Sequence, residues 1–298
     1  MYKRQPKARA ITKRRKAVRN IRKITQTMQL IATARFQKCF QRAVATQPYT
    51  RKITEMIQTL AALEAAEHPL LKPNDSPQAG ILLVITSNRG LCGAYNASVL
   101  RVAAEYYRAQ RAAGRPPQIE MVGKKGVNIG RFLGFPLART ITDVEDRIAF
   151  ARVAELAERY MALYQTGAIA GVHVAFTQFL STSSQRPQVA QLLPIEPPRA
   201  AEAARPGATT SIRHEFEFSP PPGALLARLI PEAVKIRLFQ AFNDAIVSEQ
   251  VARMVAMKAA TDAAGDMLKF LTRQYNRARQ TQITTELADI VGGANAVQ

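Results

Sequence analysis

The segment MVAMKAATDAAGDMLKFLTRQYNRARQTQITT, residues 254–285, decides the fold because one face of it repeats with strict heptad spacing. Steps of three and four residues alternate throughout, which is typical of a helix that packs along another helix. Several of these positions hold small or polar side chains rather than large apolar ones. The predicted seam consists of Met254, Met257, Thr261, Ala264, Leu268, Leu271, Tyr275, Ala278, Gln282 and Thr285.

This seam lies within a longer helical stretch, residues 223–291, which has Pro231 near its start and Gly265 as its only internal glycine. At 1.5 Å per residue, such a helix would be about 100 Å long. The N-terminal stretch, residues 10–67, also lacks glycine and contains only Pro48. It predicts a helix of about 85 Å, with a possible bend at the proline. Its apolar residues recur three and four apart at Val18, Ile21, Ile24, Met28 and Ile31.

Between the two helical stretches, short apolar runs alternate with helical patterns. The expected strands are residues 81–86, 118–123, 171–180 and 188–197, and the expected helices are 97–113, 124–133 and 149–167. This alternation is typical of an α/β layer with a mainly parallel sheet. We therefore predict an α/β protein, with a long antiparallel coiled coil of N- and C-terminal helices and an inserted small, Rossmann-like α/β domain. The expected divisions are residues 1–67, 78–222 and 223–298.

The charge balance points to an acidic partner. The net charge is +20, and residues 1–54 contain sixteen Lys and Arg without one acidic residue. Such a segment is a solvated face, a nucleic-acid-binding element, or a basic helix inside an acidic protein cavity. It contains only four aromatic residues and no known nucleic-acid-binding motif, which weighs against the nucleic-acid reading. No apolar run approaches the roughly 18 residues of a membrane span, and no signal peptide is expected.

Catalytic signatures are absent from the sequence. His68, His173 and His214 each stand alone, and two cysteines allow neither a disulfide framework nor a CxxC metal site. The stretch SNRGLCGAYN, residues 87–96, has the strand–glycine–helix layout of a phosphate loop. However, Arg89 is its only cation and it matches no nucleotide motif. We predict a tight structural turn, with Arg89 tying this turn to a helix or a neighbouring subunit. No catalytic residue, cofactor or metal is expected.

Three segments carry a family resemblance: ITKRRKAVRNIRKITQTMQLIATARFQKC, ITSNRGLCGAYNASVL, and SEQVARMVAMKAATDAAGDMLKFLTRQYNRARQTQITTELADIVGGANAV. Together they resemble the gamma subunit of F-type ATP synthases, from about Ala10 to Gln298. The resemblance implies a rotor shaft whose paired terminal helices run inside a ring of three alpha and three beta subunits. The inserted domain would then be a foot on the ion-driven membrane ring. Rotation would drive ATP synthesis or hydrolysis on the beta subunits, and the chain itself would be no enzyme.

The resemblance also assigns roles to single residues. Arg279 and Gln280 match family residues that catch a beta-subunit loop, and Thr284 lies one turn further along the helix. Lys23 and Met28 match the motif beside the beta-subunit lever, although Met28 could simply pack the coiled coil. Arg253 matches the arginine of the family's ARM sequence. Phe216 and Phe218 resemble the foot segment that leads into the C-terminal helix, although Ser219 stands where the family commonly has an acid.

The implied partners are the alpha and beta subunits, the epsilon subunit and the membrane ring of c subunits. No nucleic acid is expected, and the membrane would be reached only through these partners, on the cytoplasmic face of a bacterial plasma membrane. Cys39 and Cys92 do not form the regulatory cysteine pair of chloroplast gamma subunits, so no thiol switch is expected. A basic coiled-coil nucleic-acid-binding protein is the alternative, and a nucleotide-binding enzyme is a more distant one.

Overall fold

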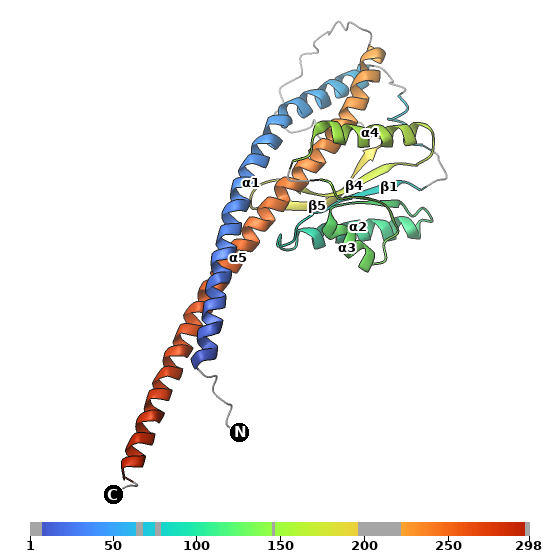
Figure 1. Cartoon of the computed structure of the whole chain (residues 1–298). Coiled ribbons are helices and arrows are strands. Elements are labelled where there is room, and N and C mark those ends of the chain that lie inside the picture. The colour runs from blue at the N-terminus through green and yellow to red at the C-terminus, as the bar shows by residue number, and fades with distance from the viewer. Residues whose placement is uncertain (1–7, 64–67, 75–78, 145–146, 196–221, 296–298) are drawn as a thin grey trace, which may run out of the picture. The chain divides into compact units, whose positions relative to one another are not determined.

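A computed structural model describes residues 8–63, 68–74, 79–144, 147–195 and 222–295. The chain divides into two compact units, Met1–Thr33 with Arg253–Gln298, and Ala34–Ala252. Two long helices, α1 (Ala8–Leu63) and α5 (Pro222–Asn295), contribute to both units. The other elements belong to the second unit (Figure 1): β1 (Ile81–Ile85), α2 (Tyr95–Ala112), β2 (Gln118–Val122), α3 (Lys124–Phe132), β3 (Leu137–Ile141), α4 (Phe150–Gln165), β4 (Val172–Phe179) and β5 (Gln185–Leu193).

The first unit is an antiparallel pair of helices. The Thr261 Oγ1 hydroxyl donates to Thr25 Oγ1 at 2.8 Å, and the Arg15 guanidinium lies 4.8 Å from the centre of the Tyr275 ring. Residues later in α5 therefore pair with residues earlier in α1, so the two helices run antiparallel. A small apolar core lies between the helices and consists of Ile11, Val18, Ala264 and Leu271.

The predicted seam on α5 faces α1 over most of its length. Met257, Ala264 and Leu271 are buried, and the seam residues between and beside them are half-buried as far as Ala278. Gln282, the next seam residue, is exposed. The heptad pattern of α5 therefore continues past Ala278, which is the last seam residue that is at least half-buried among the described residues.

The apolar stripe predicted on α1 mostly faces solvent within this unit. Buried residues of α1 recur seven apart, at Ile11, Val18, Thr25 and Ala32. Among the predicted positions only Val18 belongs to this set, because the others lie about 60° to 100° around the helix from the buried residues. The exposed fractions are 52% for Ile21, 56% for Ile24, 37% for Met28 and 48% for Ile31.

The second unit is built on a five-stranded sheet of order β3-β2-β1-β4-β5. The β1, β2, β3 and β4 strands pair in parallel, and β5 returns antiparallel to β4. The predicted α/β layer with a mainly parallel sheet is confirmed. The sequence patterns identified four of these strands but missed β3, whose LARTI sequence is exposed or half-buried at every position and so lacks a buried strand's signature.

Alternate residues of the central strands pack into two different hydrophobic cores. Leu82 and Val84 of β1 face a core shared with α2 and α3, whereas Ile81, Leu83 and Ile85 face a core shared with α4 and α5. Figure 1 shows α2 and α3 together on one side of the sheet and α4 on the other. The two-residue period of the strands therefore produces a three-layer α/β unit.

Helices α1 and α5 also pair antiparallel within the second unit. Ile53 of α1 packs with Ala233 and Ile236 of α5, and an earlier part of α1 packs with a later part of α5 through Cys39, Ala43, Ile246 and Val247. Both helices continue through their prolines, Pro48 and Pro231. The expected division at residues 67, 78 and 222 remains a prediction.

Candidate functional site

The turn from β1 into α2 is held by its own polar side chains. The Ser87 backbone N–H donates to Asn96 Oδ1 at 3.0 Å, and the Asn96 side-chain amide donates to the buried Cys92 Sγ at 3.3 Å. Leu91 and Gly93 have positive φ values of 63° and 57°. The glycine at 93 suits this backbone. The geometry is that of a tight structural turn between strand and helix.

The turn is also hydrogen-bonded to the start of α3, the helix that follows the neighbouring strand β2. A phosphate loop works by aiming free N–H groups at the start of a helix toward an anion. Here the first three N–H groups of α3 donate to the segment that follows β1, at 2.9 to 3.1 Å: Lys124 to Asn88 Oδ1, Lys125 to Ser87 O and Gly126 to Thr86 Oγ1. These three N–H groups, on the helix beside the turn, are therefore not available to bind an anion.

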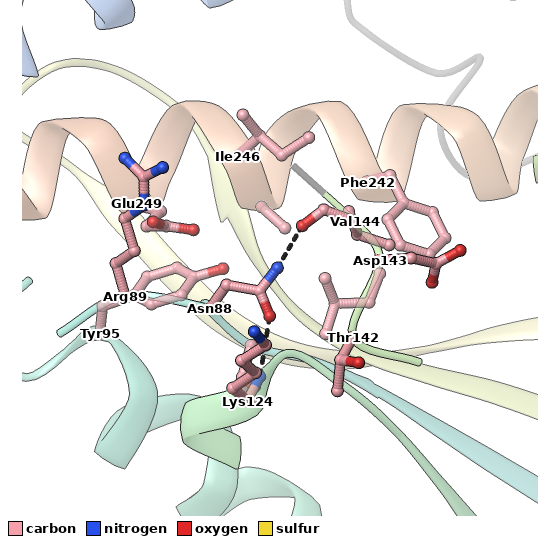
Figure 2. A pocket seen from close by; sticks show the side chains of 13 residues that line it. Asn88, Arg89, Tyr95, Lys124, Thr142, Asp143, Val144, Phe242, Ile246 and Glu249 are labelled. Atoms are coloured by element: carbon pink, nitrogen blue, oxygen red, sulfur yellow. Dashed lines mark hydrogen bonds between the residues drawn. The ribbon is translucent and has the colours of Figure 1, made fainter. Parts of the chain in front are cut away.

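A cavity of about 260 Å³ lies between this turn and α5 (Figure 2). Asn88 crosses one side of it, accepting from the Lys124 N–H and donating its amide to the carbonyl of Val144. The lining mixes charges of both signs, since Lys124 and Arg89 are matched by Asp143 and Glu249. This balance does not select an anion. Arg89 lines the cavity together with Phe242, Ile246 and Glu249 of α5, and its tie to a helix or a neighbouring subunit remains a prediction.

Catalytic groups do not converge in the part of the chain that the structure describes. That part contains no group of three His, Cys, Asp or Glu side chains able to hold a metal. His68 Nδ1 accepts from the Leu70 N–H at 3.2 Å, and burial lowers the pKa of this imidazole. The His173 ring packs at a tilt against Tyr106, with the ring centres 4.8 Å apart. Both histidines have local structural contacts, and His214 lies outside the described residues.

A buried charged cluster anchors β2 to α4 and was not predicted. Both carboxylate oxygens of Glu120 accept from Arg159 Nη2 at 2.5 Å, and the Tyr160 hydroxyl donates to Glu120 at 2.8 Å. Burial raises the pKa of the Tyr160 hydroxyl. The sequence signal for this cluster was the single acid in the apolar strand QIEMV, because a carboxylate in a hydrophobic core needs a charged or hydrogen-bonding partner.

A second buried carboxylate lies on α5. Asp244 is only 9% exposed and accepts a hydrogen bond from Gln240 Nε2 at 2.7 Å. Burial raises its pKa to about 6. The helical pattern of the sequence gave no sign that this acid faces the protein interior.

The predicted contacts on α1 lie together on its surface. Lys23 and Met28 line one shallow groove with Asn20, Ile24 and Thr27. Met28 is 37% exposed and so is not a core residue of the first unit. Its surface position leaves it accessible to a partner, as the family resemblance implies. Its role in coupling remains a prediction.

The predicted contacts on α5 lie at two places along the helix. Arg253 is half-buried, whereas Arg279, Gln280 and Thr284 are exposed. The Thr284 hydroxyl donates to the backbone carbonyl of Gln280 at 2.9 Å. Because Thr261 lies level with Thr25, Arg279 is about 27 Å beyond the groove of α1. Lys23 and Met28 on α1 therefore lie apart from Arg279, Gln280 and Thr284 on α5, and Arg253 lies on α5 on the other side of Thr261 from Arg279.

The end of α5 is fully accessible among the described residues. Every residue from Arg279 to Ala294 is exposed, including Ile283, Leu287 and Ile290. The two predicted foot residues, Phe216 and Phe218, lie outside the described residues. None of the described helices is long and apolar enough to cross a membrane.

Relatives with known names span nearly the whole chain. The family described as ATP synthase matches residues 7–297. The ATP synthase gamma chain of Rhodopirellula baltica is 44% identical over 292 residues, covering 98% of this chain and 99% of that one. The ATP synthase gamma chain of Saccharopolyspora erythraea is 35% identical, covering 97% of each chain.

Solved structures with a similar fold come from mitochondrial complexes. A chain of the Euglena gracilis mitochondrial ATP synthase, from its OSCP/F1/c-ring structure, aligns with a TM-score of 0.67 at 19% identity, covering 97% of this chain and 94% of that one. A chain of the Tetrahymena thermophila central stalk and c-ring aligns with a TM-score of 0.57 at 21% identity, covering 80% and 99%. The fold and the sequence matches agree, and the chain belongs to the ATP synthase family, among its gamma chains.

Proposed function

We propose that the chain is the central-stalk rotor subunit of an F-type ATP synthase. It transmits torque between an ion-driven membrane ring and a catalytic ring of alpha and beta subunits, and so drives rotary ATP synthesis or hydrolysis. The observation that carries this proposal is the antiparallel pairing of the two chain ends in one unit, with a long exposed stretch of α5 continuing from it. Such a unit suits a shaft better than a substrate-binding domain.

A shaft drives its neighbours only if it presents different surfaces in different directions. A contact shifts a conformational equilibrium by its differential affinity for the two states. The groove on α1 with Lys23 and Met28, and the exposed residues Arg279, Gln280 and Thr284 on α5, are distinct faces of this kind. We assign the rotor–stator contacts to these residues and to Arg253.

The chain itself is proposed to be non-catalytic. The N–H groups at the start of α3 are bound to Asn88, Ser87 and Thr86, and the adjoining cavity has balanced charges. Nucleotide binding and turnover then belong to the beta subunits. The foot engages the membrane ring and the epsilon subunit, and the chain reaches the membrane only through these partners, on the cytoplasmic face of a bacterial plasma membrane.

The basic composition fits the same function. Cations of α1 and α5 attract acidic loops of the surrounding ring, with a strength that falls with ionic strength. The nucleic-acid-binding alternative rests on composition alone, and the relatives give it no support. The nucleic-acid-binding alternative would be favoured if the chain bound DNA with a steep salt dependence and did not assemble with alpha and beta subunits.

Co-expression with the alpha and beta subunits of the same organism tests the proposal. We expect a complex that contains one copy of the chain and hydrolyses ATP much faster than alpha and beta subunits alone. The isolated chain should bind no ATP. A stable complex whose ATPase rate is the same with and without the chain would refute the rotor function.

A further inference from the structure

We infer that the outer face of α3 is a docking surface for an acidic segment of a partner subunit. The surface, called here the α3 patch, consists of Lys125, Ile129, Arg131, Phe132 and Leu133. The inference rests on the proposed function, because the partner is taken to be another subunit of the complex. It adds a contact on the foot that differs from the coupling residues of the first unit.

The inner face of α3 is built for close packing on the sheet. Gly126, Val127 and Gly130 are buried. A Cβ at Gly126 would lie 2.2 Å from Thr86 Oγ1, and one at Gly130 would lie 3.2 Å from Met121 Cε. The two glycines therefore let the helix approach the strands, and they fix which side of α3 faces outward.

The outer face carries apolar side chains in a row. Lys125, Ile129 and Phe132 are four and three residues apart, so they share one face of the helix. Phe132 is 89% exposed, Leu133 52% and Ile129 37%. Nearby Phe135, in contrast, is half-buried and packs on Tyr107 with ring centres 6.0 Å apart. An almost fully exposed aromatic beside two exposed aliphatic residues marks a surface that a partner covers.

The charge around this row specifies the chemistry of the partner. Helices α2 and α3 cover the same face of the sheet. Between residues 95 and 132, seven cations are exposed and Glu105 is the only exposed acid, because Glu120 is buried against Arg159. The seven are Arg101, Arg108, Arg111, Arg115, Lys124, Lys125 and Arg131.

This arrangement favours a protein segment over other anions. Protein interfaces place apolar side chains at the centre and polar or charged ones at the rim. The α3 patch follows that layout, with Ile129, Phe132 and Leu133 between flanking cations. A surface that binds phosphates would place its cations at the centre. The matching segment has apolar side chains at its centre and carboxylates at its edges, so complementary charge would also orient it.

A photo-reactive probe in the assembled complex tests the inference. Phe132 is replaced by p-benzoylphenylalanine, and cross-linked subunits are identified after illumination, with and without Lys125→Glu and Arg131→Glu together. A probe at Leu180, which is 56% exposed beyond the end of β4, is the matched control. Assembly and ATP hydrolysis are measured on the same samples.

We expect the probe at residue 132 to cross-link one partner subunit. Its yield should fall about tenfold with the double charge reversal and should fall as salt rises from ~50 mM to ~300 mM. The yield at Leu180 should not respond to the charge reversal. An assembled, ATP-hydrolysing complex with no cross-link at 132, or with one that ignores the reversal, overturns the inference.

Two further outcomes separate this inference from others. If Phe132→Ser abolishes salt-dependent binding of the chain to DNA or to anionic vesicles, the patch serves a nucleic acid or a membrane and the protein assignment is wrong. If the unaltered chain does not assemble with its partners at all, the proposed function fails first, because the inference presupposes the complex.

Discussion

Replacing the buried acid of α5 should stabilise the second unit at neutral pH. Asp244 is 9% exposed and accepts a hydrogen bond from Gln240. Burial raises its pKa from 3.8 to about 6. A group whose pKa is higher in the folded state binds its proton more tightly there than in the unfolded chain. Its ionisation therefore destabilises the fold as pH rises through the interval from 3.8 to about 6.

The size of the effect follows from the shift. One pKa unit corresponds to about 1.4 kcal/mol, so the shift to about 6 corresponds to about 3 kcal/mol. Asp244→Asn keeps the shape and an acceptor for Gln240 but removes the titration. We expect the variant to exceed the natural chain in unfolding free energy by up to about 3 kcal/mol at pH 8. Near pH 4 the two chains should have similar stability.

Urea unfolding of both chains at several pH values, followed by circular dichroism, measures this difference. Asp266→Asn is the matched control, because its carboxylate is 78% exposed beside Lys269, and an exposed pair of this kind contributes little. A stability difference between Asp244→Asn and the natural chain that does not change between pH 4 and pH 8 would refute the reasoning. So would a loss of stability at pH 8.

Further predictions concern the sheet, the shaft helix and the coupling residues. Glu120→Ala should lower the unfolding free energy by about 3 kcal/mol, because Arg159 loses its carboxylate partner; equal urea midpoints would contradict this. Gly265→Ala should raise the stability of α5 by about 0.5–1 kcal/mol, since its new Cβ would lie 3.7 Å from Arg22 Nε. Gly123→Ala should instead prevent folding, because φ is +95° and a Cβ would lie 2.4 Å from Thr86 O; a soluble, cooperatively unfolding variant would contradict that. The double variant Arg279→Ala and Gln280→Ala should lower ATP turnover more than it lowers assembly. Unchanged turnover in an assembled complex would contradict the proposed contact of these residues with a beta-subunit loop.

The helices and the central sheet could be predicted because their patterns are repetitive. The heptad steps from Met254 to Ala278 require a partner helix, and the alternation of apolar runs with helical patterns requires an α/β layer. Strand β3 was missed because it lies at the sheet edge and buries no residue. Its neighbours in the sheet, not its own sequence, make LARTI a strand.

The direction of exposed side chains was harder to predict than the elements. Ile21, Ile24 and Met28 have the spacing of a seam but face solvent, while Thr25, a polar residue, takes the buried place. Spacing alone does not say which of two stripes a partner helix will cover. The turn at residues 87–96 has the same ambiguity, since only the structure reveals the hydrogen bonds among Ser87, Asn96 and Cys92 that hold it.

Direct observation of rotation tests the central claim. The alpha/beta ring is fixed to a surface and a probe is attached to the foot through Ser183→Cys, an exposed position, while Cys39 and Cys92 are buried and resist labelling. On addition of ATP we expect the probe to turn in one direction with three equal steps per revolution, one for each beta subunit. ATP hydrolysis that depends on the chain but leaves the probe stationary would contradict a rotor function.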